Sequence, residues 1–125
     1  MTTDSNNRLR ILVVDDEVDT ADSLALVLNL WGHEAQAVYS GHQALNAIRT
    51  LRPDVVLLDL QMPLMHGGEV AARLRLSLLD VVIIATTATD EYDAQLEPYR
   101  YLFNGYLRKP FDPVELSSMM AQTQR

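Results

Sequence analysis

Residues 55–59 read Val-Val-Leu-Leu-Asp, an uninterrupted apolar run that ends on a carboxylate. Four consecutive Val and Leu residues are typical of a parallel strand covered on both faces, because no side chain then has to face water. An ordinary loop residue after such a strand need not be acidic. We therefore take Asp59 as a candidate functional residue at the carboxyl end of a buried strand.

Three other apolar runs end in the same way, on residues that suit phosphoryl chemistry. Residues 11–14 lead into Asp15 and Asp16, residues 82–85 lead into Thr86 and Thr87, and residues 105–108 lead into Lys109. The carboxyl ends of parallel strands meet at one edge of a sheet, where α/β proteins bind ligands. The four runs predict one crevice holding carboxylates, a hydroxyl and an ammonium, which suits a Mg²⁺-dependent aspartyl-phosphate site.

The segments between the strands carry apolar residues at helical spacing. We expect helices over 18–31, 41–51, 69–76, about 90–100 and from Pro113, alternating with strands at 11–14, 34–39, 55–59, 81–85 and 105–108. Pro98 is expected to shorten or kink the fourth helix, and Trp31 is expected to lie in the core at the end of the first. Right-handed crossovers then give an α/β fold, a three-layer α/β/α sandwich that repeats the (βα) unit five times.

Length and composition fit one soluble domain. The 125 residues are enough for one core and too few for two ordinary domains, and we expect a flexible tail at 1–8 and the domain at 9–123. The net charge of −7 argues against direct nucleic-acid binding. No apolar run approaches the roughly 20 residues that span a bilayer. With no cysteine and no signal-peptide pattern, a cytoplasmic location is expected.

The acidic residues predict a metal ion. At about 4 Å and an effective dielectric near 20, each pair of carboxylates costs on the order of 4 kcal/mol, which a cation relieves. Mg²⁺ prefers hard oxygen ligands, so we expect Asp16 and Asp59 to bind it and Asp15 to hold a water or orient its neighbours. Asp15 and Asp16 alone would equally suit a charged turn before a helix. The third acid, Asp59, favours the metal.

Lys109 is the only lysine, because the nine other basic residues are all arginine. Its place at a strand end favours a role as a compact positive charge on an anion, and Thr87 offers a hydroxyl donor to the same anion. Glycine-rich phosphate loops and Ser-His-Asp or Cys-His sets are missing from the sequence. The three histidines do not have the spacing of metal ligands.

Together, four motifs resemble the receiver domain of bacterial two-component response regulators. They are Val13-Val14-Asp15-Asp16-Glu17, Asp59-Leu60-Gln61-Met62-Pro63 with Gly67, Thr87-Ala88, and Lys109-Pro110-Phe111. The likeness covers residues 9–122. It implies a flavodoxin-like, doubly wound parallel sheet of five strands in the order 2-1-3-4-5.

The resemblance implies a role for each site residue. Asp59 would accept a phosphoryl group from a phosphohistidine on a sensor histidine kinase or a histidine phosphotransfer protein. Mg²⁺ would be held by Asp16, Asp59 and the backbone carbonyl of Gln61, with Asp15 behind these ligands. Lys109 would contact the phosphoryl group.

The resemblance also implies a switch. Thr87 would move toward the phosphoryl group, and the ring of Tyr106 would turn inward with it. The surface made by the fourth helix, the fifth strand and the fifth helix would then control a downstream protein effector or a homodimer, with no direct contact to nucleic acid or membrane. Such a domain catalyses only its own phosphorylation and dephosphorylation, so it is not expected to be an enzyme that acts on a metabolite.

Two features bear on how far the family pattern applies. Tyr101-Leu102-Phe103 stands where receivers usually carry small residues. The aromatic residues of this region either form a docking surface or fill the space left by the missing small ones; they are Tyr92, Tyr99, Tyr101, Phe103 and Tyr106. Gln61 and Thr89 occupy the variable positions that tune the lifetime of the phosphoryl group in this family.

Other functions are weighed against this hypothesis. A Mg²⁺-dependent phosphatase of the haloacid-dehalogenase type needs a second acid two residues after its nucleophile, where this chain has Gln61. A phosphorylation-independent interaction module with a receiver fold is the main alternative, although loss of the site should have scattered its residues. A stand-alone receiver and a receiver from a longer regulator both fit the sequence, although the start at Met1 argues against the C-terminal domain of a hybrid kinase.

Overall fold

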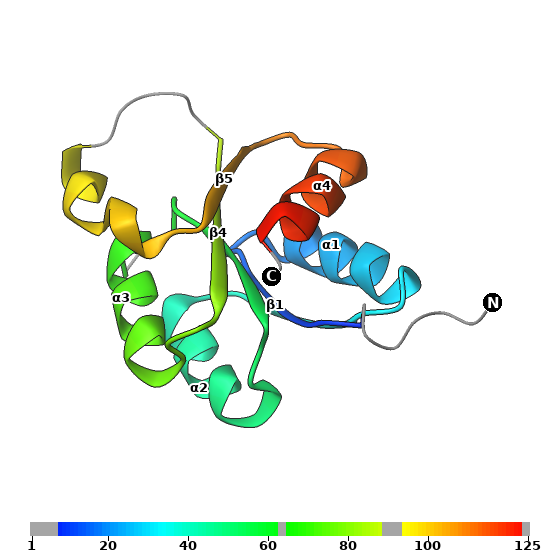
Figure 1. Cartoon of the computed structure of the whole chain (residues 1–125), viewed down its shortest axis with the longest axis horizontal. Helices are drawn as coiled ribbons and strands as arrows, with labels where there is room; N and C mark the ends of the chain where they lie inside the picture. The colour runs from blue at the N-terminus through cyan, green and yellow to red at the C-terminus, as the bar shows by residue number, and fades with distance from the viewer. Residues whose placement is uncertain (1–7, 63–64, 89–93, 124–125) are drawn as a thin grey trace.

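The computed structural model describes residues 8–62, 65–88 and 94–123. Five strands form one sheet in the order β2-β1-β3-β4-β5, and every neighbouring pair is parallel (Figure 1). The strands are β1 (Arg10–Val14), β2 (Glu34–Val38), β3 (Val55–Asp59), β4 (Val82–Thr87) and β5 (Gly105–Arg108). The expected fold class, strand order and five-fold alternation of strand and helix are therefore confirmed.

Helices cover both faces of the sheet, as Figure 1 shows. Those described are α1 (Val18–Leu30), α2 (Gly41–Leu51), α3 (Gly67–Ser77), the 3₁₀ helix η2 (Ala94–Leu102) and α4 (Pro113–Thr123). One apolar cluster joins α2 and α3 to the sheet, and a second joins α1 and α4 to its other face. The result is the three-layer sandwich that the crossover rule predicts.

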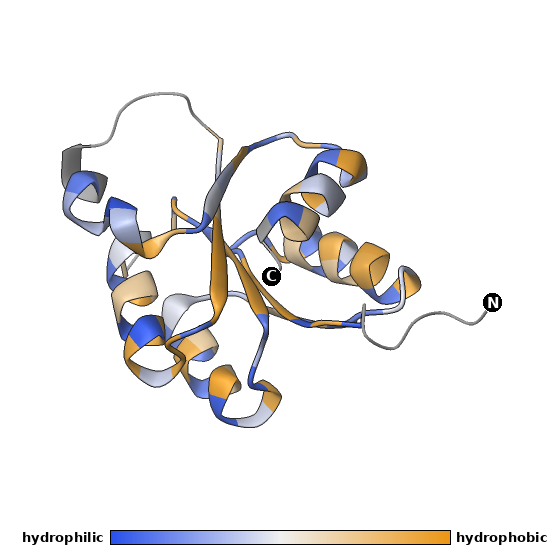
Figure 2. Cartoon of the chain, viewed as in Figure 1, coloured by the Kyte–Doolittle hydropathy of each residue, from blue (hydrophilic) through white to orange (hydrophobic). Residues whose placement is uncertain are grey.

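The alternation of side chains along each strand divides the core in two. In β1, Leu12 and Val14 face the α2–α3 side, whereas Ile11 and Val13 face the α1–α4 side, and β3 follows the same rule. Residues two apart share a face of a strand, so a strand with apolar residues at every position serves both layers. The hydropathy colouring of Figure 2 accordingly shows the middle of the sheet as apolar.

One sequence-based expectation is refined by the structure, and another was wrong. The fourth expected helix is present over Ala94–Leu102, where it is a 3₁₀ helix with Pro98 inside it; residues 90–93 lie outside the described part of the chain. Proline lacks an N–H and its ring clashes with the preceding turn, which disfavours an α-helical ladder. Trp31 is 39% exposed, because it caps α1 beyond the last buried turn and the chain then reverses at Gly32, whose φ is +100°.

A single arginine ties together the loops at the amino-terminal rim of the sheet. The Arg75 guanidinium, on the last turn of α3, donates hydrogen bonds to the carbonyls of Leu79, Val81 and Leu102. It also donates to Asn104 Oδ1 at 2.7 Å. The carboxyl end of η2 is thereby fixed to α3 on the side opposite the strand ends that carry the site.

Within the described residues, no helix has both the length and the apolar character needed to cross a membrane. The tail expected at residues 1–8 falls almost wholly outside the described part of the chain, so it stays a prediction.

Candidate functional site

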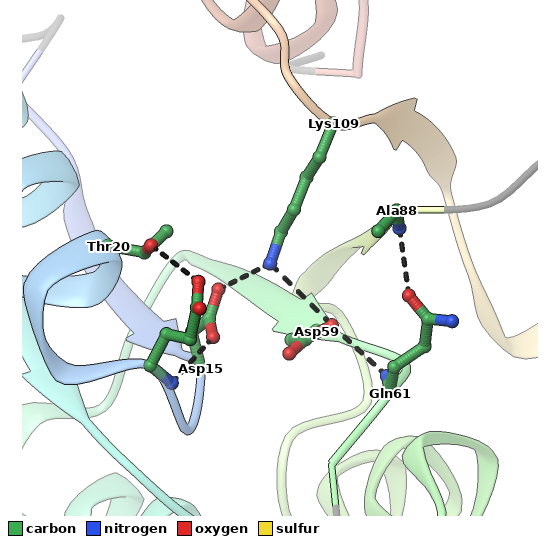
Figure 3. Close-up of polar contacts among 7 residues, drawn as sticks. Asp15, Thr20, Asp59, Gln61, Ala88 and Lys109 are labelled. Carbon is green, nitrogen blue, oxygen red and sulfur yellow. Dashed lines mark hydrogen bonds and ion pairs between the residues drawn. The ribbon is translucent and has the colours of Figure 1, made fainter.

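The sheet register brings the predicted site residues to one edge. Asp59, the last residue of β3, pairs with Thr86, and Thr87, the last residue of β4, pairs with Arg108. Asp15 directly follows β1, and Lys109 directly follows β5. Figure 3 shows Asp15, Asp59 and Lys109 converging on one point. The structure therefore brings Asp15, Asp59 and Lys109 together at this edge, and the register places Thr87 at the same edge.

Three carboxylates gather in this crevice. Oxygens of Asp15, Asp16 and Asp59 lie within 4.8 Å of one another. Asp15 and Asp59 are each 4% exposed, whereas Asp16 is open to solvent. Carboxylate oxygens are the ligands that Mg²⁺ accepts, and an open side leaves room for the waters or phosphate oxygens it retains. This donor set fits the ion that the sequence predicts.

Both carboxylate oxygens of Asp15 accept hydrogen bonds from the protein itself. Its Oδ2 accepts a hydrogen bond from the Lys109 ammonium at 2.6 Å, and its Oδ1 accepts one from the Glu17 N–H at 2.9 Å. These two bonds hold the Asp15 carboxylate beside Lys109 and leave lone pairs on both of its oxygens. The expected division of roles between Asp15 and the exposed Asp16 stays a prediction.

The carboxyl group of Asp59 has a raised pKa, so it loses its proton at a higher pH than an ordinary aspartate. The pKa of Asp59 is raised to about 6, chiefly by burial; the Gln61 N–H and Lys109 lower it, and the neighbouring Asp15 adds to the rise. The Gln61 N–H donates to Asp59 Oδ1 at 3.1 Å, and the Lys109 ammonium lies 3.7 Å from the same oxygen. The hydrogen-bond donors of the protein do not fully offset the cost of burying this negative charge. A bound cation would reduce that cost further.

Gln61 makes a contact that the sequence did not predict. Its side-chain Oε1 accepts a hydrogen bond from the Ala88 N–H at 2.9 Å (Figure 3). The resemblance gives this residue a backbone carbonyl for the metal and a variable position in the family, but no side-chain contact. No sequence pattern signals the bond, because it depends on how the loops after β3 and β4 face each other.

Tyr106 lies outside the crevice, on the η2 side. Its hydroxyl donates to the Arg100 carbonyl at 3.5 Å, and its ring centroid is 5.5 Å from that of Phe103. Tyr106 pairs with Ala85, two residues before Thr87, so Thr87 and Tyr106 share one face of neighbouring strands. This placement is compatible with the expected coupling, which stays a prediction.

Some aromatic residues near η2 and β5 fill space in the core, and others lie on the surface where a partner could dock. The Tyr99 ring packs directly on Gly68, where an added Cβ would lie 2.3 Å from its Cδ2, and Phe103 packs partly buried against the core. Tyr101, by contrast, is 84% exposed. Some of these rings therefore fill space, and others present an apolar surface. Tyr92 lies outside the described residues, as do Pro63 and Thr89.

An open hollow adjoins the crevice between α1 and the segment after β5. It measures about 790 Å³, and its walls include Leu24, Val27 and Phe111, with Asp19 also on the lining. Lys109 and Asp15 contribute to it as well. A partner seated in this hollow would therefore reach the charged residues of the crevice.

Comparisons with known proteins agree with the geometry. The family model described as the response regulator receiver domain matches residues 11–121. The DNA-binding response regulator MtrA of Mycobacterium tuberculosis (strain ATCC 25618 / H37Rv) is 43% identical over 112 residues, which are 87% of this chain and 47% of MtrA. The chain spans about half the length of the curated relatives it matches.

Solved structures show the same likeness. The response regulator TrrA of Thermotoga maritima, in complex with Mg(2+)-BeF, superposes with a TM-score of 0.81 at 33% identity, covering 92% of this chain and 98% of TrrA. The chemotaxis protein CheY4 of Vibrio cholerae gives a TM-score of 0.84 at 25% identity, covering 94% and 99% of the two chains. On its fold, its strand-end residues and these matches, the chain belongs to the response-regulator receiver-domain family.

Proposed function

We propose that this domain accepts a phosphoryl group on Asp59 from the phosphohistidine of a sensor histidine kinase or a histidine phosphotransfer protein. The observation that carries the proposal is the position of Asp59 at a strand end, near Asp15 and with the Lys109 ammonium 3.7 Å from its Oδ1. A carboxylate in such a place is a nucleophile with its charge neutraliser already at hand.

In the proposed transfer, an Asp59 carboxylate oxygen attacks phosphorus, a P–O bond forms, and the P–N bond to the donor imidazole breaks. Lys109 meets the negative charge on the transferred oxygens while Asp15 holds it in place. Mg²⁺, bound by Asp16, Asp59 and the Gln61 carbonyl, would supply further charge neutralisation to those oxygens. Later attack of water on the acyl phosphate returns Asp59 and inorganic phosphate, so the domain acts only on itself.

The output of the proposed reaction is a change of surface. Thr87 would approach the new phosphoryl group, and Tyr106 would leave the Arg100 carbonyl and turn inward. The exposed face of η2, β5 and α4 would then bind a protein effector or a second copy of the domain. The phosphoryl donor would dock at the hollow beside α1, whose apolar walls adjoin the reacting residues.

Two further lines belong to the same proposal. A cytoplasmic location fits this chain, because it has no cysteine and so needs no oxidising compartment to form disulfides. The phosphorylation-independent module gains no support from the site, because the carboxylates and Lys109 remain assembled.

The test is intact-mass spectrometry after incubation with acetyl phosphate, with and without Mg²⁺. The expected result is one phosphoryl adduct that needs Mg²⁺ and is absent in Asp59→Asn. Asp54→Asn is the matched control, because Asp54 lies just before β3, at the opposite end of the same strand. An adduct that persists in Asp59→Asn would refute the assignment.

A further inference from the structure

Gln61 bridges the two loops that border the phosphoacceptor. Its backbone N–H donates to Asp59 Oδ1 at 3.1 Å, while its side-chain Oε1 accepts from the Ala88 N–H at 2.9 Å. Figure 3 shows the backbone nitrogen of Gln61 beside Asp59 and its side chain reaching toward the Ala88 N–H. One residue thus connects the candidate nucleophile to the end of β4.

Ala88 is the first residue after β4, so its N–H lies beyond the strand's ladder of hydrogen bonds. In the free domain the partner of this N–H is a neutral carboxamide oxygen. A phosphoryl group on Asp59 would bring anionic oxygens to the same edge of the sheet. Anionic oxygens accept hydrogen bonds about twice as strongly as neutral ones, so they would compete for this donor.

Displacement of the carboxamide is physically easy. Gln61 is exposed, so its freed amide can bond to water instead. The net gain from one such neutral hydrogen bond corresponds to roughly a 2- to 10-fold factor in an equilibrium constant. The bond is therefore strong enough to bias the crevice and weak enough to be broken by a phosphoryl group.

We propose that the Gln61 carboxamide is a latch that occupies the Ala88 N–H in the free domain and must be displaced when a phosphoryl group takes its place. This inference rests on the proposed function of Asp59. Gln61 acts here as a positioning residue, and the latch lowers the affinity of the crevice for a phosphoryl group. Its removal should raise that affinity.

The test is a titration with beryllofluoride, which mimics a phosphoryl group on a carboxylate, in the presence of Mg²⁺. Gln61→Met keeps a side chain of similar length without the carboxamide oxygen, and Gln61→Ala removes the side chain beyond Cβ. We expect both variants to bind beryllofluoride about 2- to 10-fold more tightly than the wild type. In the free protein, the Ala88 amide hydrogen should exchange with solvent faster in both.

Gln43→Met is the matched control. Gln43 Oε1 accepts a hydrogen bond from the Tyr39 N–H at 2.7 Å, which is the same kind of bond in a loop that carries no site residue. Its loss should leave the affinity for beryllofluoride unchanged. A tighter complex in this variant too would overturn the latch, because the effect would then not belong to the crevice.

A purely structural role for Gln61 predicts the opposite outcome. If the side chain only props the loops, its removal lowers both the melting temperature and the affinity for beryllofluoride. Unchanged or weaker binding by Gln61→Met would therefore refute the latch while leaving the proposed function intact, provided that the wild type binds. Failure of the wild type to bind beryllofluoride or to form a phosphoryl adduct would remove the proposed function, and the latch with it.

Discussion

The Lys109 ammonium lies 2.6 Å from Asp15 Oδ2 but 3.7 Å from Asp59 Oδ1. In the free domain the lysine is thus bonded to the carboxylate that orients it and stands just short of the proposed nucleophile. A phosphoryl group on Asp59 would add anionic oxygens near the Lys109 ammonium. The lysine need not move far to meet them.

Lys109→Met should slow phosphorylation of Asp59 by roughly 10²- to 10³-fold, because a positioned charge that meets the transferred oxygens is lost. The initial rate of adduct formation with acetyl phosphate, followed by mass spectrometry, measures this. Arg49→Met is the control, since Arg49 is an exposed cation on α2. Equal rates for the wild type and Lys109→Met would show that Lys109 does not act on the phosphoryl group.

Mg²⁺ should raise the melting temperature of the wild-type domain by several degrees at millimolar concentration. A cation that binds only the folded crevice stabilises it by mass action, and about 1 kcal/mol corresponds to roughly 4–8 °C for a small domain. Asp16→Asn should reduce the shift, because Asp16 offers one of the three clustered carboxylates. Scanning calorimetry at increasing Mg²⁺ concentrations measures this shift. A melting temperature that does not change with Mg²⁺ would count against a metal site.

Without Mg²⁺, Asp59 should make the domain less stable at neutral pH. Its pKa is raised from 3.8 to about 6, so between these values the folded state keeps a proton that the unfolded chain has lost. The free energy of unfolding therefore falls as pH rises through this window. Asp59→Asn, which cannot ionise, should be more stable than the wild type at pH 7 by on the order of 1–3 kcal/mol.

Urea unfolding in a chelator at pH 4, 5 and 7 checks this sign. The advantage of Asp59→Asn should be small at pH 4, grow up to about pH 6 and then level off. Asp54→Asn, at the other end of the strand, should not show that profile. A constant difference between Asp59→Asn and the wild type at all three pH values would contradict the assigned cause.

Gly68→Ala should destabilise the domain by about 1–3 kcal/mol, because an added methyl group would overpack the contact between α3 and η2. A Cβ at this position would lie 2.3 Å from Tyr99 Cδ2 and 2.9 Å from Tyr99 Cβ. The better helix propensity of alanine works against this loss but is smaller. Chemical denaturation of the single and double variants with Tyr99→Ala gives the coupling between the two sites.

In that cycle, the cost of Gly68→Ala should largely vanish when Tyr99 is already alanine, since the ring that the methyl group would strike is gone. If the free-energy costs of the two substitutions are additive, the destabilisation by Gly68→Ala does not come from a clash with the Tyr99 ring.

The sequence predicted the sheet and the main site residues because both depend on simple local signals. A buried parallel strand must be apolar at every position, as Val55–Leu58 is, and the residue after it stands at the ligand-binding edge whatever the helices do. Asp59 and Lys109 were therefore placed correctly without any knowledge of packing.

Other features depend on contacts between distant segments, which local patterns do not encode. The spacing of residues 94–102 does not separate a 3₁₀ helix from a short α-helix. Trp31 lies at a helical interval from Leu28, but the buried face of α1, made by Ala21, Ala25 and Leu28, ends at Leu28. The bond between Gln61 and Ala88 spans 27 residues and has no sequence signal.

The hydrogen bonds of Arg75 constrain how η2 can respond to events at the strand ends. They hold the carbonyl of Leu102 and the side chain of Asn104, at the carboxyl end of this helix, to the rim farthest from Asp59. A segment pinned at one end can pivot but cannot slide. A displacement that starts at Thr87 would therefore reach η2 as a swing about Arg75, with its largest amplitude at the end nearest the phosphoacceptor.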